Sequence, residues 1–295
     1  MGQKILVTGA AGQLGRRVIH HLLETYKVPA GDIIGATRNP EQLAELAARG
    51  ITTRRADFDD AASLAAAFAG ADRLLIISTD ALAQKGHRLA QHKAAVDAAA
   101  KAGAKHLFYT SMPAPDNSLV SFAPDHLGTE QAIKASGVDY TIFRNAWYWD
   151  NFLHSLPHSL QEGKWYSSSG DGRSANISRE DCALAIAAGL ASATVERGIL
   201  TLTGPQLLTT EEIAALAAEI AGKQLQVVHI DDKQLAGGLA SAGLPGFFVD
   251  VLVSADANIR AGNFAFLTDD FRKLTGKDPQ SARSFFEAHK AALTS

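Results

Sequence analysis

The stretch KILVTGAAGQLG, Lys4 to Gly15, decides the fold, because an apolar strand runs through three glycines into the amphipathic pattern QLGRRVIHHLLETY. Spaced glycines allow a tight turn and let a pyrophosphate approach the backbone without meeting a Cβ. The start of the following helix offers free N–H groups and a positive dipole end to the anion. We therefore predict a dinucleotide site here; a purely structural turn is the alternative. The predicted contacts are Thr8, Gly9, Ala11, Gly12, Gln13, Leu14 and Gly15.

Short apolar runs alternate with helical patterns through the first half of the chain. Strands are expected at 4–9, 32–38, 52–58, 73–79, 105–111 and 139–145, with helices between them. This rhythm is typical of a parallel sheet covered on both faces. Beyond Asn145, residues 163–178 are rich in Gly and Ser and predict a loop, whereas Thr209 and Glu212 have capping-box spacing at the start of a helix.

The predicted fold is α/β: a Rossmann doubly wound parallel sheet with a smaller C-terminal α/β substrate lobe. We expect residues 1–153 and 174–204 to form the cofactor-binding domain, and 154–173 and 205–295 to form the smaller lobe.

Composition narrows the function. The 295 residues are 46% hydrophobic and 20% charged, with a net charge of −3 and no Lys/Arg block, which argues against a nucleic-acid partner. No apolar run reaches membrane-span length and no signal-peptide pattern is present, so a cytoplasmic protein is expected. The single cysteine, Cys182, has no metal-type spacing and predicts a small buried residue, and no metal is expected. A monomer and a homodimer are both compatible with the pattern.

The tip of the second strand indicates which dinucleotide binds. NAD-binding domains place an acidic residue there for the ribose 2′-hydroxyl, but this chain has Arg38 in GATRNP. An arginine can pair bidentately with a 2′-phosphate, so we predict NADPH over NADH, with Arg16 and Arg17 adding to the positive field. The alternative for Arg38 is an ordinary surface residue. Asp57 and Phe58, after the third strand, are placed to contact the adenine, although a plain turn explains them nearly as well.

The motifs TGAAGQLG, ATRNP, FYTSM and TIFRNAWYWDNF together resemble the NmrA-like branch of the atypical short-chain dehydrogenases, and within it the NADPH-dependent quinone oxidoreductases and triphenylmethane-dye reductases. The resemblance implies an NADPH-binding Rossmann domain with a substrate cleft beside it. It places Ser78, Thr79, Thr110 and Ser111 along the cofactor. It places Asn145, Trp147 and Tyr148 beside the substrate, where Phe152 also suits a flat acceptor and Asn145 could bond a quinone oxygen or the nicotinamide amide.

The helix PDHLGTEQA lacks the Y-x-x-x-K pair of typical short-chain dehydrogenases, in which the tyrosine protonates a developing alkoxide. His126 and Glu130 have the spacing of that Tyr–Lys pair and lie on one face of the predicted helix. His126 could donate a proton with Glu130 orienting it, or it could line the substrate site or be structural. The missing acid favours acceptors such as quinones, because a hydroquinone oxygen resembles a phenol with a pKa of about 10 and needs mainly positioning.

The leading hypothesis is therefore an NADPH-dependent oxidoreductase that passes a hydride to a quinone or another flat aromatic acceptor. Two alternatives stay open: an NADP(H)-sensing regulator without turnover, and a reductase of triphenylmethane dyes, azo dyes or aldehydes. Residues 243–259, GLPGFFVDVLVSADANI, are expected either to cover the cleft or to be a docked core helix.

Overall fold

A seven-stranded sheet forms the centre of the molecule. The computed structural model describes residues 2–194 and 197–294. The strand order is β3-β2-β1-β4-β5-β6-β8 and every neighbouring pair is parallel. The predicted Rossmann α/β class is confirmed. The strands are β1 (Ile5–Val7), β2 (Ile33–Thr37), β3 (Thr52–Arg55), β4 (Arg73–Ile76), β5 (His106–Ser111), β6 (Asp139–Asn145) and β8 (Gly198–Leu202).

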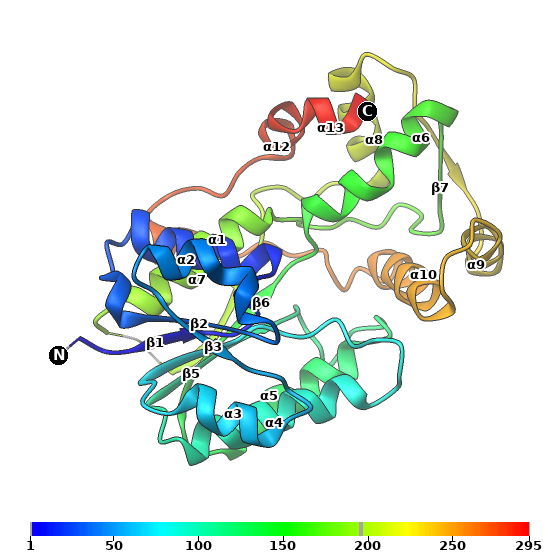
Figure 1. The fold of residues 1–295 in the computed structure, drawn as a ribbon. Helices are drawn as coiled ribbons and strands as arrows, with labels where there is room; N and C mark the ends of the chain where they lie inside the picture. The colour runs from blue at the N-terminus through cyan, green and yellow to red at the C-terminus, as the bar shows by residue number, and fades with distance from the viewer. Residues whose placement is uncertain (1, 195–196, 295) are drawn as a thin grey trace.

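Helices cover both faces of this sheet, as Figure 1 shows, with α1 and α7 above it and α3, α4 and α5 below. Each face has its own core, in which the inward side chains of β1, β4 and β5 alternate between the two. The helices are α1 (Gln13–Glu24), α2 (Ala44–Ala48), α3 (Ala61–Phe68), α4 (His87–Lys101), α5 (Ala123–Ala135) and α7 (Arg179–Ala191).

Helix α7 is the most buried of these helices. Ser178 caps its N-terminus by accepting a hydrogen bond from the amide of Asp181, and its Ala-rich surface packs closely on α1. Gly189 lies against the Phe143 ring, where an added Cβ would come within 2.8 Å. Cys182 is fully buried in this helix, as expected.

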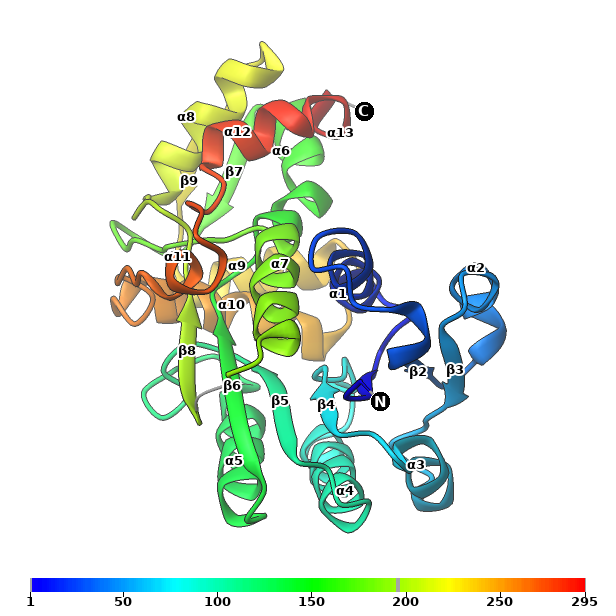
Figure 2. The same cartoon turned by 90° about the vertical axis from the view of Figure 1, so that its left-hand side faces the viewer.

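A second, two-stranded parallel sheet lies outside the first, formed by β7 (Lys164–Ser167) and β9 (Gln226–His229). The expectation of a loop throughout 163–178 was therefore wrong at its start. Trp149 and Phe286 are at the centre of the core beside this sheet. The rest of that core comes mainly from α6 (Leu156–Glu162), α8 (Thr210–Ala221), α12 (Ala282–Ala288) and α13 (Lys290–Thr294), which lie together in Figure 2. The capping box of Thr209 and Glu212 is confirmed at the start of α8.

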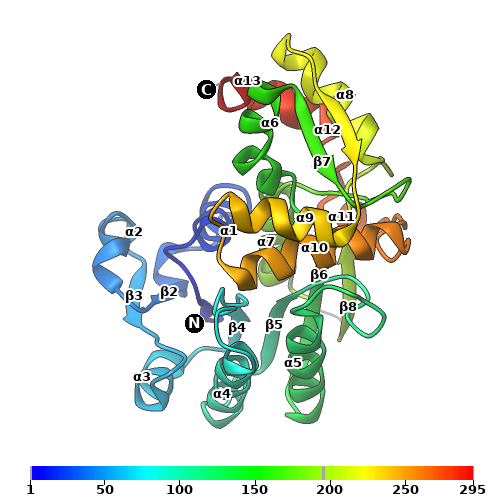
Figure 3. The same ribbon diagram turned by 90° about the vertical axis from the view of Figure 1, so that its right-hand side faces the viewer.

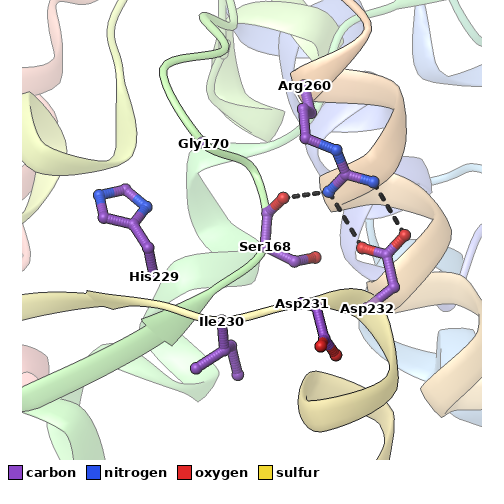
Figure 4. A pocket seen from close by; sticks show the side chains of 7 residues that line it. All are labelled: Ser168, Gly170, His229, Ile230, Asp231, Asp232 and Arg260. Atoms are coloured by element: carbon purple, nitrogen blue, oxygen red, sulfur yellow. Dashed lines mark hydrogen bonds and ion pairs between the residues drawn. The ribbon is translucent and has the colours of Figure 1, made fainter.

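Helices α9 (Asp232–Ser241) and α10 (Gly246–Arg260) pack on each other and cross in front of the carboxyl edge of the large sheet (Figure 3). The end of α10 is anchored. Arg260 forms an ion pair with Asp232 at 2.8 Å and donates to the carbonyl of Ser168, as Figure 4 shows. A cavity of about 380 Å³ lies beside the Arg260–Asp232 ion pair. The described residues contain no helix long and apolar enough to cross a membrane.

Candidate functional site

The glycine turn between β1 and α1 leaves room for a ligand to approach the protein backbone. Gly9 has φ of 59°, in the region that favours glycine, and an added Cβ on Gly15 would lie 2.3 Å from the Gly9 carbonyl oxygen. No side chain caps α1 and its first turn holds no acidic residue. The N-terminal amides of α1 are therefore available to an anion, and the turn fits a pyrophosphate.

Arg38 is exposed just beyond β2 and forms no hydrogen bond or ion pair with the residues that the structure describes. Arg16 and Arg17 have protein partners, and their addition to the positive field stays a prediction. Arg16 donates to the carbonyls of Ala11 and Gln42, and Arg17 pairs with Glu180. A guanidinium with no hydrogen bond or ion pair to a described residue, at this tip, suits a phosphate.

Asp57 and Phe58 follow β3 and are half-buried. The carboxylate of Asp57 accepts hydrogen bonds from the amide of Asp59 and from Arg55, so it stabilises its own turn. Phe58 packs partly against the core below the sheet. A contact of this pair with an adenine stays a prediction.

Hydroxyl groups at the ends of β1 and β5 hold the loop that follows β4. Thr8 Oγ1 accepts from the Ile77 amide at 2.9 Å, and Thr110 Oγ1 accepts from the Ser78 amide at 2.9 Å. The structure thus brings four residues of the predicted cofactor site, Thr8, Ser78, Thr79 and Thr110, to one edge of the sheet. Ser111 differs, because its hydroxyl donates to Glu130 at 2.7 Å.

His126 and Glu130 share a helix face but not a hydrogen bond. His126 is 4% exposed, with Tyr109 OH 2.8 Å from Nδ1 and Arg88 Nη2 3.0 Å from Nε2. Glu130 instead pairs with Arg144, so the expectation that it orients His126 was wrong. Burial, together with the charge of Arg88, lowers the pKa of His126 well below its ordinary value. The imidazole is therefore neutral near pH 7 and is enclosed by protein groups.

Asn145 is at the carboxyl end of β6, is 6% exposed, and donates from Nδ2 to Tyr148 OH at 2.9 Å. Its Oδ1 has no partner among the described residues. Whichever way the amide is turned, one of its polar atoms is left unpaired in a buried place. Such an atom is a site for a ligand donor or acceptor.

The aromatic residues after β6 pack against different parts of the protein. Trp147 packs near Phe264 and the end of α10, with ring centroids 6.3 Å apart. The Tyr148 ring lies 4.9 Å from the Arg179 guanidinium, and burial raises the pKa of its hydroxyl. Phe152 joins neither of them. It packs between Trp149 and Trp165 in the core beside the small sheet, which favours a structural role over the predicted substrate contact.

Sequence reasoning missed three residues in this region: Arg88, His92 and Tyr109. All three are buried beneath the edge where the predicted cofactor residues lie. A signal was available, because Arg88 and His92 have the same four-residue spacing on α4 as His126 and Glu130 have on α5. Two such helices side by side on one sheet face bring those pairs together. The described residues hold no group of three or more metal-ligating side chains that could bind a metal ion.

The chain is similar to known proteins along most of its length. The family described as NmrA-like matches residues 1–250. Quinone oxidoreductase 2 of Escherichia coli (strain K12) is 38% identical over 271 residues, which cover 92% of this chain and 92% of that protein.

Two solved structures are similar along nearly their whole length. The E. coli NADPH-dependent quinone oxidoreductase complexed with NADPH has a TM-score of 0.91 and 36% identity, covering 97% of this chain and 99% of that one. The Citrobacter sp. triphenylmethane reductase complexed with NADP(H) has a TM-score of 0.89 and 33% identity, covering 97% and 100%.

Proposed function

The chain belongs to the NmrA-like family, and on that premise we propose that it is an NADPH-dependent oxidoreductase that transfers a hydride to quinones. The observation that carries the choice of acceptor is the state of His126. The residue at the position of a tyrosine acid is neutral, buried and bonded on both ring nitrogens. The site therefore lacks a strong proton donor, and it suits an acceptor that does not need one.

The cofactor fits the residues present. The Gly9–Gly15 turn and the uncapped start of α1 would hold the pyrophosphate, and Arg38 would pair with the 2′-phosphate. NADPH, when bound, supplies the hydride. The amide of Asn145, with one unpaired atom, would bond the nicotinamide amide or the acceptor at the end of β6. Trp147 and Tyr148 would border the acceptor, in a cleft between the sheet domain (1–153 and 174–204) and the remaining lobe.

Acceptor chemistry explains why positioning suffices. Reduction of a simple ketone leaves an alkoxide nearly as basic as hydroxide, whereas a reduced quinone leaves an anion whose conjugate acid has a pKa of about 10. That anion can leave the cleft and take its proton from water. The protein then needs to orient a flat ring against the nicotinamide and to exclude competing water. A cationic triphenylmethane dye meets the same condition, since hydride addition makes it neutral, and the likeness to the Citrobacter sp. reductase favours it as a second acceptor.

One assay tests the proposal: NADPH oxidation followed by absorbance, with and without a benzoquinone and a cationic dye. We expect the acceptor to stimulate oxidation in a saturable manner. NADPH binding without stimulation by either acceptor would instead support an NADP(H)-sensing regulator. Absence of NADPH binding would contradict both.

A further inference from the structure

Three consecutive amides after β4 are each bonded by a side chain from a different element. Ile77 and Ser78 donate to the hydroxyls of Thr8 and Thr110, as described above, and the Thr79 amide donates to Nε2 of His92 on α4 at 3.0 Å. The carbonyls of Ile77 and Ser78 accept no hydrogen bond from any described residue. The side chains thus fix the three amides, and the carbonyls of Ile77 and Ser78 stay available as hydrogen-bond acceptors. Hydroxyl groups, which a ribose presents, can donate to them.

Thr79 is held more tightly than either neighbour. Besides its amide bond to His92, its carbonyl accepts from Arg88 Nε at 2.6 Å and its hydroxyl donates to Gln91 at 2.8 Å. The three partners lie within five residues of one another at the start of α4. The conformation of Thr79 thus depends on where Arg88 and His92 are fixed.

The protonation of both histidines follows from partners that can only donate. Arg88 has no acceptor atom, so Nε2 of His126 carries a lone pair and Nδ1 carries the proton. The Thr79 amide imposes the same state on His92, whose Nδ1–H donates to Thr129 Oγ1 at 3.0 Å. The Thr129 hydroxyl gives its own proton to the carbonyl of Asp125. Both rings are therefore neutral and fixed in one tautomer.

Tyr109 joins the two histidines. Its hydroxyl accepts from His126 Nδ1–H at 2.8 Å and lies 3.3 Å from His92 Nδ1. Arg88 links the same histidine to Thr79, because its Nη2 contacts His126 and its Nε donates to the Thr79 carbonyl. Buried hydrogen bonds thus run from His126 through Arg88 to the Thr79 carbonyl, and the Tyr109 hydroxyl brings His126 into contact with His92, which accepts from the Thr79 amide. The polar atoms that hold Thr79 are paired, whereas Arg88 Nη1 has no hydrogen-bond partner among the described residues and lies 3.8 Å from an Asp125 carboxylate oxygen. Paired groups in a buried network hold one another rigidly.

We propose that His126 is a positioning residue that acts through Arg88 and Tyr109 to hold Thr79, and with it the free carbonyls of Ile77 and Ser78, in place for the ribose of the dinucleotide. The inference rests on the proposed function, because Thr79 is a predicted cofactor contact. It assigns to the position of the missing tyrosine acid a role in binding rather than in proton transfer.

The test compares His126→Leu, which removes both bonds at similar volume, with His126→Gln, which can offer one acceptor and one donor. We expect His126→Leu to raise the Kd for NADPH about tenfold, with kcat at saturating NADPH and benzoquinone within about twofold of the parent. His126→Gln should recover most of the binding. Tyr109→Phe removes the hydroxyl that joins the two histidines, so it should also raise the Kd for NADPH. It tests the same inference if His126→Leu does not fold.

His106→Leu is the matched control, because His106 is also buried and lies at the start of the strand that carries Tyr109, 2.8 Å from Thr141. It should lower the unfolding temperature without changing Kd. An unchanged Kd in His126→Leu and Tyr109→Phe would overturn the inference, as would a loss of several hundredfold in kcat at constant Kd, which would make His126 an acid. Failure of the parent protein to bind NADPH would overturn the proposed function itself.

Discussion

The carboxylate of Glu130 on α5 accepts two hydrogen bonds from the guanidinium of Arg144 on β6, at 2.9 and 2.7 Å. Glu130 is fully buried, and Ser111 donates a third hydrogen bond to it at 2.7 Å. The bidentate pair ties α5 to two adjacent strands of the sheet. It is also the reason why the carboxylate is turned away from His126.

Loss of either partner of this pair should destabilise the protein strongly. Glu130→Ala leaves the largely buried Arg144 charge without compensation, which typically costs about 3–5 kcal/mol in the free energy of unfolding. Urea unfolding of Glu130→Ala, Arg144→Met and the double variant measures the loss in the free energy of unfolding. The double variant should lose clearly less than the sum of the single losses. Additive losses would show that the two side chains are not coupled.

The features that sequence could predict here are those set by neighbouring residues. The glycine turn, the alternation of strands and helices and the capping box of Thr209 with Glu212 each depend on a few adjacent positions. The strand Lys164–Ser167 was missed because its polar, aromatic composition shows no period, and its pairing partner Gln226–His229 lies about sixty residues further along the chain.

The candidate site shows the same limit. Spacing correctly placed His126 and Glu130 on one helix face, but their partners come from α4, β5 and β6. A residue such as Tyr109 looks like ordinary strand core in the sequence, and only the packing of α4 beside α5 gives its hydroxyl two histidine neighbours. Phe152 shows a related limit, since an aromatic residue after a strand can enter either of two cores, and its contact with a substrate stays a prediction.

Arg38→Ala should weaken NADPH binding selectively. Arg38 forms no hydrogen bond or ion pair with a described residue, so its removal costs the fold little, whereas a lost charge-assisted pair with a phosphate costs about 1.5–3 kcal/mol, or roughly 10- to 150-fold in affinity. NADH, which lacks the phosphate, should bind as before. Titration of both cofactors measures the ratio, with Arg49→Ala as the control, because Arg49 is a surface arginine paired with Glu24. An unchanged NADPH/NADH ratio would remove Arg38 from the cofactor site.

Asn145 should contribute to kcat/KM beyond its bond to Tyr148. Asn145→Ala removes the unpaired buried atom and should lower kcat/KM for a benzoquinone by about 10- to 100-fold. Tyr148→Phe removes only the acceptor of Asn145 Nδ2 and should cost less than tenfold. Steady-state kinetics of both variants decides between a ligand contact and a structural bond. Equal losses in the two would indicate that Asn145 acts only through Tyr148.

Buried neutral histidines predict a loss of stability in mild acid. Burial lowers the pKa of His92 from 6.5 to about 3 and that of His106 from 6.5 to about 4. The unfolded chain therefore binds more protons below pH 6.5, so the stabilising contribution is complete above that pH and is lost as the pH falls toward the folded-state values. Each histidine adds a slope of up to about 1.4 kcal/mol per pH unit in this window.

Urea unfolding of the parent and of His106→Leu between about pH 7 and pH 5 tests this slope. The variant should be less stable at pH 7 but should lose stability more slowly as the pH falls, because one titrating group is gone. Parallel curves would show that His106 keeps an ordinary pKa in the folded state. In the same range, neutral His126 predicts no inflection near pH 6.5 in the profile of kcat/KM with a quinone.

Gly15→Ala should damage both the fold and cofactor binding. A methyl group at this position would lie 2.3 Å from the Gly9 carbonyl oxygen and 2.9 Å from the Ala10 Cα, so the turn itself has to move. Backbone shifts of this kind typically cost about 1–3 kcal/mol of stability. The moved turn should also narrow the approach of the pyrophosphate, so we expect NADPH affinity to fall at least tenfold, by roughly 1.4 kcal/mol or more.

The matched control is Gly237→Ala in the exposed middle of α9, where an added Cβ meets nothing within 4 Å. It should raise stability by about 0.5–1 kcal/mol, because alanine loses less backbone entropy than glycine in a helix, and it should leave NADPH affinity unchanged. Thermal unfolding and cofactor titration of the two variants separate the effect of a methyl group in open space from that of one in the turn. If Gly15→Ala binds NADPH as well as Gly237→Ala does, the pyrophosphate lies elsewhere and the assignment of the glycine turn is wrong.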